Sequence, residues 1–412
     1  MVPYKHVHLY RSIASSKSSL SDTTSTASSL KESNWFRPKA IIKSPSDLAR
    51  QEDGVLEQAT YSREYHHDEF SIGVSDSHIC ITEGDLVYFW GGRNSTKGRI
   101  HVYDMSLNRW LPPIEPISIL VPQTRYYHGF VKQGKDPIFW LYGGVNEEPP
   151  NQSKWTNELY SFNLTTRMWY KHANGPSPLR GHIFLYRKSN HSLLLYSGNN
   201  SYSTNEMYEY DISNCIWEKI VQKNYISARA YASGNIIYRQ GKELLIVYGG
   251  DVGVGGQELS DELCIYDFSE QTWRIVDLMG TSIPPPLFGH ANSTCQISPT
   301  ELLIYGGCDD QYIPYAHCFI YNFVTEQWKS LAVANIKALN CSSMFIDKKR
   351  GKIHLYGGYD SGARSNIFMT IEMNTILNYT CLRAFPNLFP ALMRENLTDI
   401  SILAYDVHHM HD

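Results

Sequence analysis

A short apolar run that ends in glycine recurs six times along this chain. The copies end at Gly92, Gly144, Gly198, Gly250, Gly307 and Gly358, and 51 to 57 residues separate one end from the next. Five of the six end in a glycine pair, as in LVYFWGG and LLIVYGG. A period of this length leaves room for four strands per repeat, which is typical of a propeller rather than of a helical solenoid. The sequence therefore predicts an all-β chain with six propeller blades.

A second element follows the first five copies: an aromatic residue, six further residues, and then tryptophan. The pairs are Tyr103/Trp110, Phe162/Trp169, Tyr210/Trp217, Tyr266/Trp273 and Tyr321/Trp328. We expect each pair on adjacent antiparallel strands, where large flat rings pack one blade on the next. We expect the apolar run to be a strand buried on both faces, and the glycine pair to turn with positive φ where packing leaves no room for a Cβ.

These residues match the kelch motif, and the chain resembles the kelch-repeat family over about residues 70 to 375. The resemblance implies a six-bladed kelch propeller. Around it we expect three parts: a Ser-rich, largely disordered leader at 1–60, the propeller at 61–375, and a short helical C-terminal segment at 376–412.

Charge and cysteine usage narrow the class of protein. The net charge of −4 gives no basic field for nucleic acid or an anionic membrane surface, and no apolar run approaches the ~20 residues of a membrane span. The eight cysteines are scattered without a CxxC pair, which favours reduced thiols in the cytoplasm or nucleus.

The sixth repeat lacks the tryptophan, and a different pattern stands in its place. Leu377, Cys381, Ala384, Leu388 and Leu392 recur every three or four residues, which predicts an amphipathic helix that Pro386 and Pro390 divide. An alternative is that Tyr379 replaces the missing tryptophan in a fourth strand and the segment closes the ring.

The same segment resembles the boxes of a family of ligase subunits. Leu377, Cys381 and Phe385 are similar to the box with which substrate receptors bind elongin C. Phe389, Pro390, Met393 and Leu397 are similar to the cullin-2 box that follows it. Six kelch blades with such a tail resemble the kelch-domain-containing substrate receptors of cullin-2 RING ubiquitin ligases. The resemblance implies elongin B/C and cullin-2 as partners, with ubiquitin transfer by other subunits.

A small motif that ends in histidine precedes the inner strand of each blade. His78, His128, His182 and His290 fill four of the six places, and we assign Tyr231 and Ser343 to the other two. Because a catalytic group is normally singular, this recurrence favours a structural role.

The residues just before that place vary from blade to blade, as a binding face requires. We predict substrate contacts at Tyr126, Tyr127, Arg180, Arg229 and Phe288. An arginine framed by aromatic rings suits a carboxylate, because the guanidinium holds two oxygens at once. This fits what the resemblance implies, recognition of the extreme C-terminus of a protein substrate. The alternative is that Arg180 and Arg229 pair with neighbouring acids.

The sequence therefore predicts a protein-binding adaptor, a substrate receptor of a cullin-RING ligase for C-terminal degrons. An alternative is a kelch scaffold in trafficking, polarity or signalling. A third alternative is a propeller enzyme, but the sequence contains no catalytic motif, and we predict no catalytic residue, metal or cofactor. Two groups are dense in residue types that bind metals, His66–Asp68 and His408–His411, and both lie outside the repeats.

Overall fold

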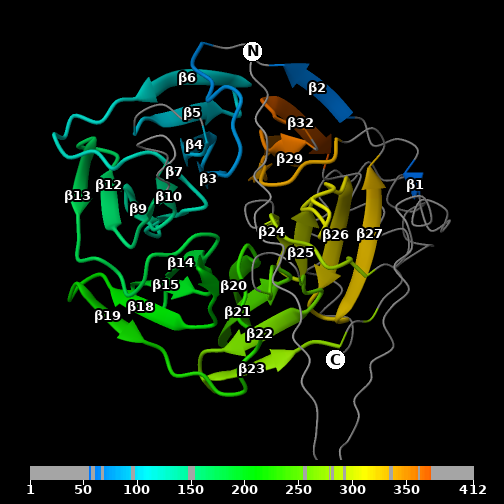
Figure 1. Cartoon of the computed structure of the whole chain (residues 1–412). Helices are drawn as coiled ribbons and strands as arrows, with labels where there is room; N and C mark the ends of the chain where they lie inside the picture. The colour runs from blue at the N-terminus through cyan, green and yellow to red at the C-terminus, as the bar shows by residue number, and fades with distance from the viewer. Residues whose placement is uncertain are drawn as a thin grey trace, which may run out of the picture. The chain divides into compact units, whose positions relative to one another are not determined.

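The structure is a computed structural model, and its described residues form six blade sheets around one axis (Figure 1). Each blade has four antiparallel strands, and the fifth blade carries one further short parallel strand at its outer edge. The described residues are 55–56, 61–65, 69–93, 98–146, 154–253, 258–277, 279, 283–290, 294–333, 337–360 and 362–372. All of them are strand, turn or irregular structure. Within these ranges, no helix has the length and apolar character needed to cross a membrane. The prediction of a six-bladed, all-β propeller is confirmed.

The first three blades follow in chain order, with the innermost strand first. Their strands are β3 (His78–Glu83), β4 (Leu86–Gly91), β5 (Ile100–Asp104) and β6 (Arg109–Ile114); β8 (Gly129–Lys132), β9 (Ile138–Tyr142), β12 (Leu159–Asn163) and β13 (Met168–Lys171); and β14 (Ile183–Arg187), β15 (Ser192–Tyr196), β18 (Met207–Asp211) and β19 (Ile216–Lys219).

The last three blades continue the ring, and two N-terminal strands join them. Their strands are β20 (Ser233–Arg239), β21 (Lys242–Tyr248), β22 (Leu263–Asp267) and β23 (Thr272–Ile275); β24 (Thr294–Ser298), β25 (Glu301–Tyr305), β26 (His317–Asn322) and β27 (Gln327–Val333) with β1 (Val55–Leu56); and β28 (Ser343–Asp347), β29 (Lys352–Tyr356), β32 (Ile367–Glu372) and β2 (Tyr61–Tyr65).

Short strands project from three blades on one face. They are β7 (Arg125–Tyr126), β10 (Val145–Asn146) and β11 (Lys154–Trp155) in blade two, β16 (Asn199–Asn200) and β17 (Tyr202–Ser203) in blade three, and β30 (Tyr359–Asp360) and β31 (Ala363–Arg364) in blade six.

The aromatic–tryptophan pairs are the contacts between blades. In all five, the aromatic residue lies directly opposite the tryptophan in the strand register. Each tryptophan also packs on the preceding blade: the ring of Trp273, for example, lies 5.0 Å from that of Tyr196, and the ring of Trp328 lies 5.1 Å from that of Tyr248. These contacts are near the spacing that aromatic pairs prefer, so the predicted role of the pairs is confirmed.

The N-terminal strand β2 completes the sixth blade. It pairs antiparallel with β32, and the register sets Tyr61 opposite Ile371, which itself lies opposite Ile353. In blade five, Trp328 holds the same register position, opposite Tyr321 and in line with Leu302. The alternative that Tyr379 forms this fourth strand is therefore wrong, because the outer edge of β32 is already occupied. The tail itself, from 373 onward, lies outside the described residues.

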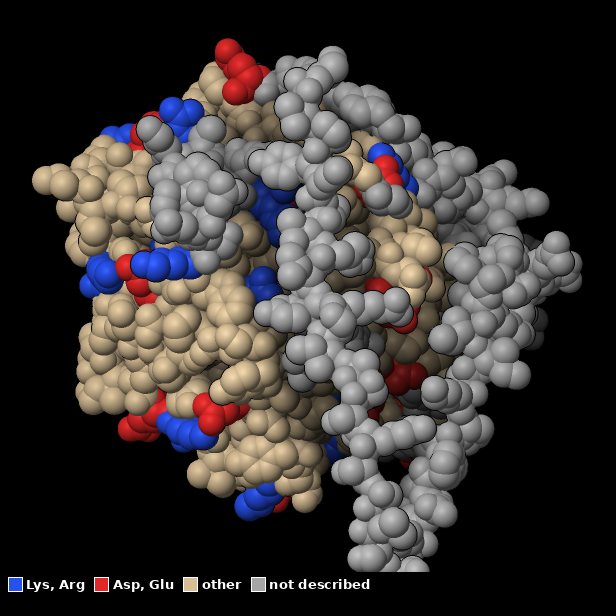
Figure 2. All heavy atoms as spheres, viewed as in Figure 1, with Lys and Arg blue, Asp and Glu red and all other residues tan. Residues whose placement is uncertain are grey.

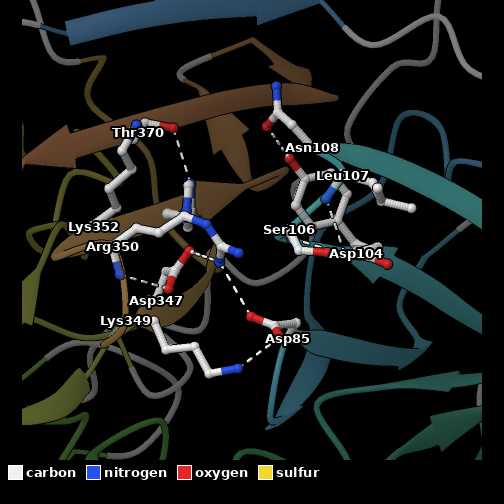
Figure 3. Close-up of polar contacts among 12 residues, drawn as sticks. Asp85, Asp104, Ser106, Leu107, Asn108, Asp347, Lys349, Arg350, Lys352 and Thr370 are labelled. Carbon is white, nitrogen blue, oxygen red and sulfur yellow. Dashed lines mark hydrogen bonds and ion pairs between the residues drawn. The ribbon is translucent and has the colours of Figure 1, made fainter.

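Polar contacts join the sixth blade to the first at the turns of their inner hairpins (Figure 3). The carboxylate of Asp85, between β3 and β4, accepts hydrogen bonds from Lys349 at 2.7 Å and from Arg350 at 3.2 Å, and Arg350 also bonds Asp347 at 2.8 Å. These side chains are partly exposed to solvent, so their ion pairs add little to the stability of the seam. The seam is held mainly by the buried cluster that includes Phe89, Phe345 and Phe368.

Candidate functional site

The strand directions gather twelve connections on one face of the propeller, which we call the mouth. Each inner strand starts there, and each glycine pair returns the chain to it, since the strands alternate in direction. Bridges such as Arg180↔Asn199 and Phe288↔Cys308 tie the segment before an inner strand to the segment after the glycine pair. The mouth is therefore built from two connections per blade.

A ring of backbone hydrogen bonds surrounds the axis at the mouth. The residue just before each histidine place has positive φ: Ser77, Tyr127, Gly181, Tyr231, Gly289 and Cys341. Five N–H···O bonds of 2.7 to 3.3 Å link consecutive members, such as Tyr231 to Gly181 and Cys341 to Gly289. Non-glycine residues adopt positive φ only where surrounding bonds enforce it, and here the ring supplies those bonds.

The four histidines lie buried beneath this ring and pack against glycines. An ideal Cβ on Gly143 would lie 2.7 Å from His182 of the next blade, and one on Gly357 would lie 2.6 Å from His78. Burial lowers the pKa of His78 and of His182 to about 3 and that of His290 to about 4. The rings are therefore neutral packing groups, as their recurrence suggests.

The other two histidine places belong to Ala232 and Ser342, a correction of one residue to our assignment of Tyr231 and Ser343. A Cβ on Gly250 would meet Ala232, and one on Gly358 would meet Ser342, as Gly144 and Gly198 would meet their histidines. This register also explains why blade three has Ser197 where other blades have the first glycine. The next blade supplies Ala232 there, and the small side chain leaves room for a serine Cβ.

The corrected register removes Arg229 from the binding surface. Its side chain is fully buried, and its guanidinium donates to the carbonyls of Ser227 and Gly249 and to the carboxylate of Glu262, at 3.0 to 3.2 Å. Arg125 repeats the arrangement in blade two with Gln123, Gly143 and Glu158. The predicted substrate role of Arg229 is therefore wrong, and the alternative of pairing with a neighbouring acid holds for it.

The remaining predicted residues meet at the mouth in one row of aromatic rings. Consecutive ring centroids lie 5.1 Å apart for Tyr126–Tyr127, 5.0 Å for Tyr127–Tyr231, 6.2 Å for Tyr231–Phe288 and 5.5 Å for Phe288–Tyr312. Burial holds the pKa of both Tyr127 and Tyr231 above its ordinary value, so their hydroxyls stay protonated. The aromatic row, Tyr126, Tyr127, Tyr231, Phe288 and Tyr312, spans blades two, four and five.

Two arginines flank the aromatic row, each stacked on an aromatic ring. The guanidinium carbon of Arg180 lies 4.7 Å from the centre of the Trp155 ring, and that of Arg93 lies 4.3 Å from the centre of the Tyr126 ring. Neither arginine forms an ion pair within the part of the chain that the structure describes. Figure 2 shows Lys and Arg side chains near the middle of the ring on the face in view. These two cations therefore have no acid partner among the residues that the structure describes.

The predicted contacts do not include Trp155. Trp155 stands at the end of the blade-two insert, where β11 pairs with β10, and no local pattern marks its contact with Arg180. Arg364 is not equivalent to Arg93, because its Nε bonds the buried carboxylate of Asp76 at 2.8 Å. The predicted contacts of the tail (Leu377, Cys381, Phe385, Phe389, Pro390, Met393 and Leu397) lie outside the described residues.

The central cavity beneath the mouth differs in chemistry. It has a volume of about 200 Å³ and is lined by the inner strands, with Ile79, Phe130, Phe184 and Met344 among its residues, and no charged side chain lines it. Among the described residues there is also no group of three or more His, Cys, Asp or Glu side chains that could hold a metal ion. The charged side chains near the axis therefore lie at the mouth and not in the cavity.

The blades and the shared mouth define a kelch-type β-propeller. The family model of the attractin/LZTR1 β-propeller matches residues 87–311, and the chain belongs to that family.

The chain is also similar, at low identity, to several curated proteins. The chain is 25% identical to host cell factor 2 of Homo sapiens over 247 residues, which cover 54% of this chain and 29% of that protein. It is 24% identical to host cell factor of Drosophila melanogaster over 64% of this chain and 18% of that protein. It is 27% identical to kelch domain-containing protein 3 of Rattus norvegicus over 26% of this chain and 27% of that protein. The chain thus spans less than a third of the length of these relatives.

Proposed function

We propose that this chain is a protein-binding adaptor that holds a terminal segment of a partner protein at the mouth. The observation that carries the proposal is the aromatic row flanked by Arg93 and Arg180. Aromatic rings supply apolar contact area at low entropic cost, and a guanidinium stacked on a ring keeps its outer edge free for two hydrogen bonds. This arrangement suits a short apolar segment that carries a carboxylate.

A free C-terminus supplies such a carboxylate on every protein chain. The Nε atoms of Arg93 and Arg180 are buried and have no hydrogen-bond partner among the described residues. Each guanidinium can donate charge-assisted hydrogen bonds to a carboxylate through its outer N–H groups, and such bonds are about twice as strong as neutral ones. We therefore place the terminal carboxylate at Arg180, between Trp155 and the aromatic row, with the preceding side chains on Tyr231 and Phe288.

We further propose that the adaptor serves a cullin-2 RING ubiquitin ligase through elongin B/C. The support comes from the boxes at Leu377–Phe385 and Phe389–Leu397 and from the closure of blade six by β2, which leaves that tail free of a closing role. Within this group, the string at 384–388 and the blade-two insert resemble kelch domain-containing protein ten. The seven described cysteines are free thiols, which supports a cytoplasmic or nuclear location.

A displayed library of peptides with free C-termini tests the mouth. We expect the wild-type chain to select a defined C-terminal pattern and to lose at least tenfold in affinity for the same peptides when they are amidated, because a charge-assisted pair contributes about 1.5–3 kcal/mol. Arg180→Ala should show the same loss for the free acid. Equal binding of acid and amide would refute the carboxylate contact.

Recovery of partners from cells tests the ligase proposal separately. We expect elongin B, elongin C and cullin-2 with the full chain, and their loss with Leu377→Ala/Cys381→Ala. Arg109→Ala, an exposed arginine on the face opposite the mouth, is the matched control. Recovery that the double variant leaves unchanged, or no recovery with the wild-type chain, would refute the ligase link and favour a scaffold.

A further inference from the structure

A buried asparagine lies beside Arg180 at the mouth. Asn199 is 5% exposed, and its side-chain oxygen Oδ1 has no hydrogen-bond partner among the residues that the structure describes. Buried polar atoms of folded proteins are nearly always hydrogen-bonded, so each exception calls for an explanation. For an exception at the mouth, the explanation to test first is contact with a bound ligand.

The strand register places the side chains of Asn199 and Arg180 on the same side. The backbones of the two residues exchange both hydrogen bonds: the Arg180 amide donates to the Asn199 carbonyl at 3.2 Å, and the Asn199 amide donates to the Arg180 carbonyl at 2.9 Å. Side chains of directly opposite residues in an antiparallel pair project from one face, with their Cβ atoms about 4.5–5.5 Å apart. The unpaired acceptor of Asn199 and the unpaired Nε donor of Arg180 therefore belong to the same part of the mouth.

Buried polar residues at the same register place in two other blades do have partners. Asp251 and Cys308 take the place of Asn199 in blades four and five. The Asp251 carboxylate accepts a hydrogen bond from the amide of Gly253 at 3.1 Å, and the Cys308 thiol donates to the carbonyl of Phe288 at 3.8 Å. The unpaired oxygen is therefore a property of blade three and not of the repeat.

The hairpin that carries Asn199 is connected to blade four. Ser203 pairs with Asn199 in the strand register of β16 and β17, and its hydroxyl donates to the carbonyl of Asp251 in blade four at 3.3 Å. Burial raises the pKa of the Tyr231 hydroxyl in blade four, and the positive charge of Arg180 opposes that rise, so the guanidinium lies within electrostatic reach of this hydroxyl. We therefore expect a segment that runs from Arg180 to Tyr231 to pass Asn199.

The end of a peptide presents an N–H donor next to its carboxylate. In the last residue of a chain, the amide nitrogen and the carboxyl carbon are bonded to the same Cα atom and lie about 2.5 Å apart. We propose that Oδ1 of Asn199 accepts a hydrogen bond from the N–H group of the partner's last residue, while the Arg180 guanidinium holds the carboxylate of that residue. This inference rests on the proposed function and adds the feature by which the mouth recognises a chain end.

Two contacts at this spacing give a specific selectivity. The carboxylate of an aspartate or glutamate side chain does not share a carbon atom with an N–H group, so an acidic side chain makes only the contact with Arg180. Proline has no N–H group, so it cannot make the contact with Asn199 as a last residue. Peptides that end in proline should therefore be absent from a selection of free C-termini on the wild-type chain, and their enrichment would contradict the proposal.

A change of one peptide bond tests the contact directly. We compare a selected C-terminal peptide with its ester analogue, in which oxygen replaces the N–H group of the last residue and the carboxylate is kept. We expect the wild-type chain to bind the ester on the order of tenfold more weakly, because a hydrogen bond is lost and the buried oxygen stays unpaired. Asn199→Ala should bind the two peptides with equal affinity.

Asn200→Ala is the matched control. Asn200 is the next residue of the same strand, so its side chain projects to the other side, where its amide donates to the hydroxyl of Ser177 at 2.9 Å. This variant should discriminate between the two peptides as the wild-type chain does. Loss of discrimination in Asn200→Ala would show that the hairpin as a whole, and not the Asn199 oxygen, is responsible.

Each other outcome decides a different statement. Equal binding of the peptide and its ester by the wild-type chain would refute the contact with the last N–H group and leave the carboxylate contact standing. Discrimination that persists in Asn199→Ala would refute Asn199 as the acceptor. Peptide binding that amidation of the C-terminus does not weaken would refute the proposed function, and this inference with it. The two peptides are compared on the wild-type chain first, so the contact is tested even if Asn199→Ala fails to fold.

Discussion

Arg229 and Arg180 lie only one register position apart in their blades, yet their surroundings differ: Arg229 is fully buried and paired with Glu262, whereas Arg180 stacks on Trp155. Replacement of Arg229 by alanine would remove a fully buried guanidinium and leave two carbonyls and the Glu262 carboxylate without their donor. Breaking a buried pair costs about 3–5 kcal/mol. Because Glu262 is about a quarter exposed, we take the lower part of that range, about 3–4 kcal/mol.

The expected loss converts into a melting temperature. A propeller of roughly 310 residues has an unfolding entropy of about 0.65 kcal/mol/K, so Arg229→Ala should lower the melting temperature by about 5–6 °C. Arg180→Ala removes a stacked but unpaired cation, and its effect should stay near 1 °C. Arg125→Ala should fall between them, because Lys171 still pairs with Glu158 at 2.7 Å after the change.

Differential scanning calorimetry of the three variants measures these shifts, and the peptide titration supplies the complementary readout. Arg229→Ala should bind terminal peptides as the wild-type chain does at a temperature where it is folded, whereas Arg180→Ala should not. An Arg229→Ala variant that melts with the wild-type chain but loses peptide binding would refute the corrected register.

Three further predictions concern the fold. Ala232→His should destabilise the protein, because the new ring would meet the Cβ of Ser197. In a double-mutant cycle of melting temperatures, Ser197→Gly/Ala232→His should recover part of the loss, and equal losses in the single and double variants would contradict the packing. The pKa values of the buried histidines are lowered, so below pH 6.5 the unfolded state binds protons that the folded state does not. The free energy of unfolding should therefore be highest above pH 6.5 and fall as the pH drops toward 4, by about 2 kcal/mol per histidine at pH 5. Denaturant titrations at a series of pH values check this, and a flat profile between pH 7 and 5 would contradict it. A chain that begins at His66 lacks β2 and exposes the edge of β32, so it should have a lower melting temperature and should aggregate. A chain that begins at Asp53 keeps β2 and should melt as the whole chain does. Equal melting temperatures of the two truncated chains would contradict closure by β2.

The repeated residues made the fold predictable, and the exceptions to the repeat carried the errors. The glycine pairs and the tryptophans each mark their strands in five copies, so the repeat is clear and even the cross-strand pairing follows from it. Blade four has Ala232 where four of the other blades have histidine. Without that marker the sequence points to Tyr231, one residue too early, and this shift brings Arg229 into the predicted mouth.

Two other features depend on contacts that no local pattern reveals. The strand Tyr61–Tyr65 has no glycine pair or tryptophan, and its partner β32 lies about 300 residues further along the chain. Trp155 meets Arg180 only because the insert of blade two folds back as β11 beside β10. Contacts of this kind require the assembled ring, because neither partner has a sequence motif that points to the other.

The most direct test of the account is a fluorescence anisotropy titration of one selected C-terminal peptide against the wild-type chain, Arg180→Ala, Phe288→Ala and Arg109→Ala. The account predicts that both mouth variants lose affinity at least tenfold and that Arg109→Ala, on the opposite face, does not. Equal affinity of all four proteins would contradict the claim that the mouth holds the partner.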